Sequence, residues 1–431
     1  MFLVNYEEAL SYLSDRSSSG IRLGLGRIKE LLRRLGNPHL DLKAIHIGGT
    51  NGKGSTAVML AGILQKAGYR TGAFTSPHLH SFTERYRIDG ACISRERIAE
   101  LTGEMRPHLE AMAADGFERP TGFEAGTALA FLYFSREKVD YLVLEVGLGG
   151  RCDATNVVRP LLSVITNVSV DHQEYLGNSI REIAGEKAGI IKRGVPTVTA
   201  AAGEALEVIE DTCRKRNSPL TVVGRDVRWE HVSLSEEGQC FTICGLKRKY
   251  EDIGISLLGR HQQVNAATAV AAVEVLMDLG VDISAGAVRA GLAAARWPGR
   301  LEVMRRKPLV IIDGAHNYEG ARSLRRALAD HFPGREMVLV IGMLDDKERF
   351  KVVAELAPAA RAVVVTRPDS PRAAKWQQLA VAARRHVREV YLEELIEEAV
   401  EKALSLAGPE DLVCFTGSFY LIAGVRKLLA Q

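Results

Sequence analysis

The chain has 431 residues, of which 46% are hydrophobic and 25% are charged. This composition excludes disordered, collagen-like and small disulfide-stapled proteins, and the length suits two or three domains. Lysine and arginine number 56 against 53 aspartate and glutamate residues, and the net charge of +3 provides no general field that would attract nucleic acid or an anionic membrane. We therefore expect neither partner, and an anionic ligand would need a local site.

Other features of the composition predict a cytoplasmic protein. No run of about 18 apolar residues is present, and Glu7 and Glu8 stand where the apolar segment of a signal peptide would lie. The six cysteines are scattered without a CxxC pair, which favours free thiols over a zinc site or a disulfide framework.

Short apolar runs alternate with helical periodicity along most of the chain, which predicts an α/β protein with a mostly parallel sheet. In chain order, the predicted strands are residues 43–47, 70–74, 141–146, 161–166, 195–199, 309–313, 337–342, 362–366 and 412–417. Residues 225–255 alternate about turn residues at 237 and 238, which predicts an antiparallel excursion. Two helices should follow, one over residues 261–279 and one that ends near residue 295.

A domain boundary is predicted within residues 296–300, because Pro298 breaks a helix and Gly299 permits a turn before the pattern restarts. The first domain, residues 1–295, should carry a phosphate-binding loop on a mostly parallel sheet. The second and smaller domain, residues 296–431, should be a Rossmann-like, doubly wound sheet.

The segment IGGTNGKGST, residues 47–56, lies between a predicted strand and a predicted helix. Its glycines allow backbone amides to turn around an anion, and the start of the helix adds a partial positive charge. Lys53 adds a mobile cation for the terminal phosphates of a nucleotide. A glycine-rich turn between two core elements is the alternative interpretation.

The loop departs from the GxxxxGK[ST] pattern, because Gly54 stands where a hydroxyl would ligate magnesium. Either Ser55 replaces that ligand or ligands come from elsewhere in the chain. Glu145 ends a predicted strand and could face the loop, whereas Ser76 and His172 follow strands and could each be a ligand or an ordinary turn residue.

Nine segments together resemble the folylpolyglutamate synthase and dihydrofolate synthase family, a branch of the Mur ligase superfamily. They are GTNGKGST (49–56), SPHL (76–79), FEAGTALAF (123–131), LEVGLGGRCDATN (144–156), TNVSVDH (166–172), GEKAGIIK (185–192), WPGRLE (297–302), DGAHN (313–317) and TGS (416–418). The resemblance extends in order over nearly the whole chain. It implies an ATP-dependent ligase that adds L-glutamate to dihydropteroate, to reduced folates, or to both, through an acyl phosphate.

The resemblance also implies residue roles. ATP contacts fall on Gly49, Thr50, Asn51, Gly52, Lys53, Gly54, Ser55 and Thr56, with Asn265 near the adenine, Arg300 on the phosphates and Asp313 near the ribose. One Mg²⁺ falls on Ser76, Glu145 and His172, and a second on a carbamylated Lys187, which would otherwise be an ordinary surface lysine of a helix. Pterin contacts fall on Leu23, Gly24, Leu25, Thr121, Phe123, Asp153 and Ala154, and glutamate contacts on His316 and Ser418.

Lys53, Lys187 and His316 are the candidate catalytic residues, with His316 a candidate base for the glutamate amine by position alone. A folylpolyglutamate synthase that does not use dihydropteroate is the main alternative. A Mur-type peptidoglycan ligase is more remote, because the phosphate loop begins too early for a preceding sugar-nucleotide domain. A GTP switch is disfavoured because the sequence has no NKxD segment. A nucleic-acid-stimulated ATPase would need a basic stripe and is disfavoured by the near balance of charge. The family resemblance also implies a monomer.

Overall fold

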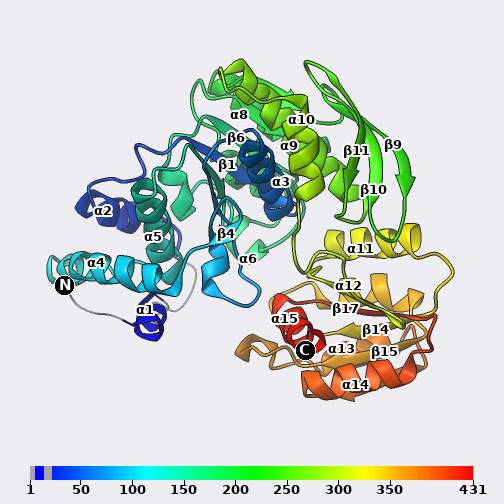
Figure 1. The fold of residues 1–431 in the computed structure, drawn as a ribbon. Coiled ribbons are helices and arrows are strands. Elements are labelled where there is room, and N and C mark those ends of the chain that lie inside the picture. The colour runs from blue at the N-terminus through cyan, green and yellow to red at the C-terminus, as the bar shows by residue number, and fades with distance from the viewer. Residues whose placement is uncertain (1–4, 14–21, 431) are drawn as a thin grey trace. The chain divides into compact units, whose positions relative to one another are not determined.

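The computed structural model describes residues 5–13 and 22–430, which divide into two compact units (Figure 1). The first unit comprises residues 1–230, 242–253 and 264–295, and the second comprises residues 231–241, 254–263 and 296–431. Two short segments from the region between residues 231 and 263 thus group with the second unit, although the sequence analysis places them in the first domain.

An eight-stranded, mostly parallel sheet forms the centre of the first unit, in the order β4-β3-β2-β5-β1-β6-β7-β8. The strands β3 and β4 at one edge run antiparallel to their neighbours, and every other pair is parallel. The bounds are β1 Ala44–Gly48, β2 Thr71–Phe74, β3 Tyr86–Ile88, β4 Ala91–Cys92, β5 Tyr141–Glu145, β6 Leu162–Ile165, β7 Thr197–Thr199 and β8 Leu220–Val222. The central position of β1 explains why all five of its residues are buried.

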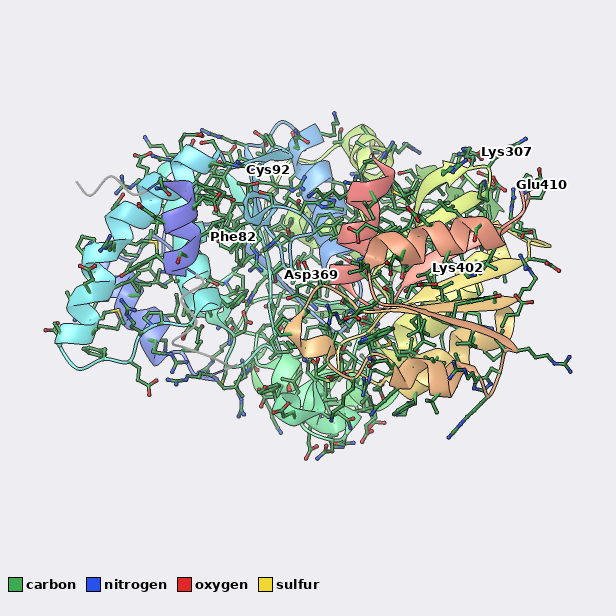
Figure 2. All side chains as sticks on the ribbon, turned by 90° about the horizontal axis from the view of Figure 1, so that it is seen from below. Phe82, Cys92, Lys307, Asp369, Lys402 and Glu410 are labelled. Carbon is green, nitrogen blue, oxygen red and sulfur yellow. The ribbon has the colours of Figure 1, made fainter. Side chains whose placement is uncertain are left out.

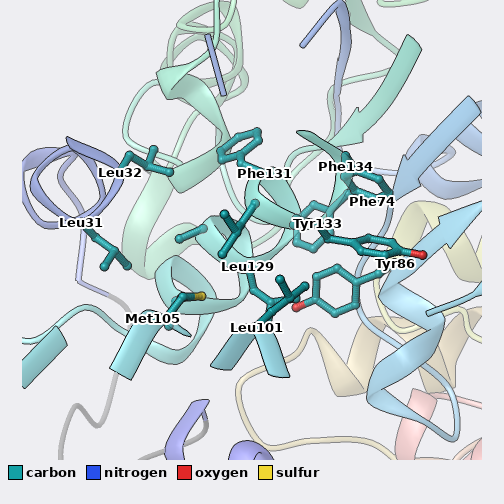
Figure 3. Close-up of a cluster of buried hydrophobic side chains, with 14 of the residues drawn as sticks. Leu31, Leu32, Phe74, Tyr86, Leu101, Met105, Leu129, Phe131, Tyr133 and Phe134 are labelled. Atoms are coloured by element: carbon teal, nitrogen blue, oxygen red, sulfur yellow. The ribbon is translucent and has the colours of Figure 1, made fainter. Parts of the chain in front are cut away.

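Helices cover this sheet, and their apolar faces supply most of its core. Figure 3 shows side chains of α2, α4 and α5 packed with Phe74 of β2 and Tyr86 of β3. The helix α3, which begins at the phosphate loop, contacts β1, β2 and β5 and packs against α10. The bounds are α1 Tyr6–Leu13, α2 Gly26–Arg34, α3 Lys53–Lys66, α4 Arg95–Ala114, α5 Gly122–Arg136, α6 Gln173–Leu176, α7 Ile180–Ala188, α8 Gly203–Lys215, α9 Arg260–Asp278 and α10 Ala285–Ala294, with short 3₁₀ turns η2 Phe82–Arg85 and η3 Ala154–Val157.

The predicted antiparallel excursion is a three-stranded sheet of β9 (Arg228–Leu234), β10 (Gln239–Cys244) and β11 (Lys249–Ile255). Consecutive strands are hydrogen-bonded neighbours joined by short turns, and such turns can connect only antiparallel strands.

The second unit contains a six-stranded sheet in the order β12-β13-β17-β14-β15-β16, in which only β12 is antiparallel to its neighbour. Its apolar core joins side chains of the inner strands to those of the surrounding helices. The strands are β12 Glu302–Arg306, β13 Leu309–Asp313, β14 Met337–Ile341, β15 Ala362–Thr366, β16 Glu389–Glu393 and β17 Leu412–Thr416, and the helices are α11 Tyr318–His331, α12 Arg349–Leu356, α13 Gln378–Ala383, α14 Ile396–Leu406 and α15 Phe419–Leu429, with 3₁₀ turns η4 Ala357–Ala359 and η5 Pro371–Ala373. The predicted α/β class, with two separate sheets, is confirmed.

All nine predicted strands are present within one or two residues of their expected bounds, and the two helices predicted after residue 260 are α9 and α10. The sequence analysis missed β3, β4, β8, β12 and β16, four of which lie at the edge of a sheet. Edge strands are short or carry charged side chains, so they lack the apolar run by which buried strands are recognised.

All six cysteines are free thiols, as predicted. No helix of the described residues is long and apolar enough to cross a bilayer.

Candidate active site

The phosphate loop connects β1 to α3, as the sequence predicts. Gly52 immediately precedes the helix with φ +81°, and a β-carbon there would lie 2.3 Å from Oδ1 of Asn265 on α9. Gly49 has φ +138°, and a β-carbon would lie 2.0 Å from Oγ1 of Thr166. Both positions therefore require glycine, because the backbone is left-handed and the neighbouring chain is too close for a side chain. Asn265 is thus brought to the loop from a distant part of the sequence.

Residues 166–169 hold the loop from the adjacent strand end. The Thr50 amide donates to the Asn167 carbonyl (2.8 Å), and the Asn51 amide donates to Asn167 Oδ1 (2.7 Å). Thr166 Oγ1 donates to the Asn51 carbonyl (2.7 Å), and the Ser169 amide donates to Thr50 Oγ1 (3.0 Å). The sequence analysis expected the loop amides to surround an anion, but two of them are engaged by Asn167. The anion-binding amides are therefore expected at the first turn of α3, before its first helical hydrogen bond, from Thr56 to Gly52.

Two lysine side chains converge on one carbonyl of this loop. Lys53 Nζ donates to the carbonyls of Gly49 (3.2 Å) and Thr50 (3.1 Å), and Lys187 Nζ, from α7, donates to the Gly49 carbonyl (2.9 Å). Lys187 is only 4% exposed, so it is not the ordinary surface lysine of the alternative interpretation. Burial, assisted by repulsion from Lys53, lowers the pKa of Lys187 to about 7. A substantial fraction of neutral amine is therefore present at physiological pH.

The candidate metal ligands occupy neighbouring strand ends. Glu145, at the end of β5, is 3% exposed, and its Oε2 accepts a hydrogen bond from the Ser76 amide (3.0 Å), which joins two of the candidates. His172 adopts a left-handed conformation (φ 50°) before α6, and its neighbour Asp171 acts electrostatically on Lys187. The described part of the chain contains no group of three or more His, Cys, Asp and Glu side chains that could hold a metal ion. The predicted set of Ser76, Glu145 and His172 contains only two side chains of these types, so it does not need such a group.

The candidate pterin residues come from three segments of the first unit. Thr121 caps α5, where its hydroxyl accepts from the Glu124 amide and its own amide donates to Glu124 Oε2. Arg27 Nε donates to the same carboxyl oxygen (3.0 Å), and this ion pair ties the start of α2, and therefore residues 23–25, to the start of α5. The Phe123 ring lies on the backbone of Gly147, where a β-carbon would be 2.3 Å from Cζ.

The third pterin segment is the η3 turn, which contacts α5. Asp153 caps this turn, accepts from the Thr155 amide and is 6% exposed. Burial raises the pKa of Asp153, and hydrogen bonds from Thr155 and from backbone amides of the same loop oppose that rise. The helices α2 and α5 and the η3 turn contact one another, which brings the three candidate segments together.

In the second unit, two of the candidate residues lie against the ring of Phe419. Arg300 lies over this ring, with 4.7 Å between Cζ and the ring centroid, and the centroid of His316 lies 6.0 Å from it. Asp313 accepts from the amides of Leu301 and Ala315, and burial raises its pKa while Arg300 opposes the rise. Ser418 precedes Phe419 and caps α15 through a hydrogen bond from Tyr420 N (3.1 Å).

The tautomer of His316 follows from its partner. Nδ1 lies 2.8 Å from the Gly314 carbonyl, which can only accept, so Nδ1 carries the hydrogen and Nε2 is the basic nitrogen. Figure 2 draws the described side chains on the ribbon.

Sequence reasoning missed several residues that shape these regions. Asn167 lies inside the quoted TNVSVDH motif, and Phe419 directly follows TGS, so proximity to a motif was the available signal. Arg27 and His261 carry no such signal. His261 is half-buried, and desolvation and the charge of Arg300 lower the pKa of its imidazole to about 4.

Comparison with known proteins agrees with this arrangement. The Mur ligase middle domain matches residues 47–273, and the Mur ligase glutamate ligase domain matches residues 299–419. The dihydrofolate synthase/folylpolyglutamate synthase of Bacillus subtilis (strain 168) is 41% identical over 431 residues, which cover 98% of this chain and 99% of that protein.

Solved structures give the same result. Mycobacterium tuberculosis folylpolyglutamate synthase complexed with ADP and AMPPCP aligns with a TM-score of 0.91 at 36% identity and covers 99% of both chains. Escherichia coli FolC in complex with DHPP and ADP aligns with a TM-score of 0.89 at 31% identity, over 99% of this chain and 98% of that chain. The chain therefore belongs to the Mur ligase family and, within it, to the dihydrofolate synthase/folylpolyglutamate synthase ligases.

Proposed function

We propose that this protein joins the amino group of L-glutamate to the carboxylate of dihydropteroate and of reduced folates, with hydrolysis of ATP to ADP and phosphate. Family membership supports the ligase activity. The convergence of Lys53 and Lys187 on the Gly49 carbonyl, beside the start of α3, is the observation that carries the proposal for this chain. The Lys53 cation at a helix N-terminus suits the terminal phosphates of a nucleotide, and a carbamylated Lys187 would hold a cation beside them.

A carboxylate does not react with an amine at neutral pH, so it must first be activated. An oxygen of the pteroate carboxylate attacks the γ-phosphorus of ATP, ADP leaves, and an acyl phosphate forms. Lys53 neutralises charge on the transferred group, and the amides at the start of α3 orient it. The nucleotide complexes of the M. tuberculosis and E. coli relatives support ATP binding here. The family resemblance implies Asn265, Arg300 and Asp313 as further contacts.

The residues fit the two Mg²⁺ ions that the family resemblance implies. Ser76, Glu145 and His172 would hold one ion; they include a buried carboxylate hydrogen-bonded to the Ser76 backbone, and oxygen donors suit Mg²⁺. Lys187 fits carbamylation, because burial lowers its pKa and neutral amine reacts with CO₂. When bound, the two ions, one of them held by the anionic carbamate, would offset the charge of the phosphates.

The pterin group would lie against Phe123, whose aromatic face suits a flat ring, with Thr121, Asp153, Ala154 and residues 23–25 as further contacts. Glutamate would bind at His316 and Ser418 in the second unit. Its amine attacks the acyl carbon, phosphate leaves, and the amine gives up a proton. Nε2 of His316 is the basic nitrogen that could receive it.

The test is a ligation assay with purified protein, ATP, Mg²⁺ and glutamate, and with either dihydropteroate or a tetrahydrofolate. ADP release that depends on both glutamate and a pteroate is the expected result. Turnover with tetrahydrofolate alone would establish the monofunctional alternative. ATP hydrolysis stimulated by DNA or RNA, without any pteroate, would contradict the proposal. A cytoplasmic location and a monomer remain predictions that cell fractionation and light scattering can test.

A further inference from the structure

A fully buried histidine occupies the central strand of the first sheet. His46 lies in β1, opposite Leu144 of β5 and Ser163 of β6, and is 0% exposed. The flanking residues Ala44, Ile45 and Ile47 are apolar and equally buried. An imidazole in such a position is costly unless its polar atoms are hydrogen-bonded. Its single hydrogen-bond partner among the described residues is therefore informative.

That partner is the hydroxyl of Thr155 in η3, with 2.8 Å between Nε2 and Oγ1. The direction of this bond can be deduced. Thr155 Oγ1 donates its only hydrogen to Oδ1 of Asp153 (2.5 Å), so towards His46 it can only accept. Nε2 must therefore carry the imidazole hydrogen. Nδ1 is then a bare acceptor, in agreement with its lack of a partner within the described residues.

The three side chains form a directed chain of hydrogen bonds, from His46 to Thr155 to Asp153. The Asp153 carboxylate also accepts from the amides of Thr155 (3.0 Å, to Oδ1) and Leu148 (2.8 Å, to Oδ2). Polarisation by His46 makes the Thr155 hydroxyl a stronger donor, because each bond in such a chain reinforces the next. The orientation of the carboxylate thus depends on a residue of the central strand.

Other hydrogen bonds hold the backbone of η3 in place. Lys192 Nζ donates to the Asn156 carbonyl (2.9 Å), and Asn156 Nδ2 donates to the carbonyls of Arg151 (2.9 Å) and Gly189 (3.3 Å). These contacts involve neither His46 nor the Thr155 hydroxyl. Loss of the side-chain hydrogen bonds should therefore change the orientation of the Asp153 carboxylate, which keeps its two backbone amide donors, while the turn stays in place.

We propose that His46 and Thr155 are positioning residues that orient Asp153, and the adjoining Ala154, for recognition of the pterin ring. This inference rests on the proposed function, in which Asp153 contacts the pterin. Neither residue would touch the substrate. Their effect should therefore appear in pterin affinity rather than in nucleotide binding or in the chemistry of phosphoryl transfer.

The experiment compares Thr155→Val, which removes the hydroxyl at nearly constant volume, with Thr155→Ser, which keeps it. Thr268→Val is the matched control, because Thr268 is also fully buried and donates to a backbone carbonyl on α9 (2.7 Å). KM for dihydropteroate, KM for ATP, kcat and the melting temperature are measured for each. Thr155→Val should raise KM for dihydropteroate by at least about tenfold with KM for ATP within about twofold, and Thr155→Ser should restore it.

The same assay on His46→Leu and His46→Gln tests the far end of the chain, because a glutamine amide retains a donor. His46→Leu should raise the pterin KM and His46→Gln should recover much of it. The double variant His46→Leu/Thr155→Val should be no worse than Thr155→Val alone, since both changes interrupt one chain.

Several results would overturn the inference. An unchanged pterin KM in Thr155→Val would do so, as would equal losses of stability and of both KM values in Thr155→Val and Thr268→Val. If a variant is too slow to assay, its affinity for dihydropteroate is measured directly by the fluorescence of the pterin and compared with that of wild type. Failure of the proposed function is distinguishable, because the wild-type protein would then neither bind nor ligate any pteroate.

Discussion

Replacement of Lys187 by methionine should change how stability depends on pH. Burial and the charge of Lys53 lower the pKa of Lys187 from its ordinary value of 10.5 to about 7. Between these values the unfolded chain binds a proton that the folded chain does not, so unfolding becomes less favourable as pH rises. The penalty for burying the charged amine is complete below pH 7 and absent above pH 10.5. It amounts to about 5 kcal/mol, since each pKa unit corresponds to about 1.4 kcal/mol.

The assay is urea unfolding of wild type and Lys187→Met from pH 6 to pH 10.5 in CO₂-free buffer. The free energy of unfolding of wild type, minus that of the variant, should rise across this window by about 5 kcal/mol. Lys192→Met is the control, because Lys192 is less deeply buried and its pKa falls to about 8. Its difference curve should begin to rise about one pH unit later and rise less.

A difference curve for Lys187→Met that stays flat within about 1 kcal/mol would refute the reasoning, because it would mean that the amine keeps an ordinary pKa. Addition of ¹³C-bicarbonate at pH 8 gives an independent reading. A carbamate carbon signal should appear in wild type and be absent from Lys187→Met. Equal signals in both proteins would contradict carbamylation at Lys187.

Three further predictions follow from close contacts. Gly52→Ala should abolish nucleotide binding, as measured by calorimetry with ADP, because its β-carbon would meet Asn265. The control is Gly185→Ala on α7, where a β-carbon meets open space. This variant should bind ADP normally and gain up to about 1 kcal/mol of stability. Retained ADP affinity in Gly52→Ala would contradict the loop geometry. Glu274→Gln should lower the free energy of unfolding by about 2 kcal/mol, because the buried carboxylate accepts hydrogen bonds from two amides of the β10–β11 turn and from one tyrosine hydroxyl. A loss below about 0.5 kcal/mol, measured by urea unfolding, would show that the carboxylate is dispensable. Phe419→Leu should raise KM for glutamate by about fivefold, because Arg300 and His316 lose the ring against which they pack, and an unchanged KM would exclude that role.

Local patterns in the sequence determined the class of the fold and the position of the phosphate loop. Buried parallel strands are continuous apolar runs, so all nine predicted strands could be recognised without knowledge of their neighbours. The glycines before Lys53 have a similar local cause, because a turn from strand to helix needs left-handed backbone conformations. Edge strands such as β12 and β16 escaped recognition, since partial exposure replaces apolar runs with charged and mixed patterns.

Tertiary structure alone decided which groups meet. The engagement of two loop amides by Asn167, the approach of Asn265 to Gly52 and the chain from His46 to Asp153 join segments that are far apart in the sequence. Burial likewise decided the chemistry of Lys187, because its lowered pKa arises from desolvation and from the nearby Lys53. The periodicity of apolar residues along the chain does not predict such contacts, because they form only after the strands have paired and the helices have packed on them.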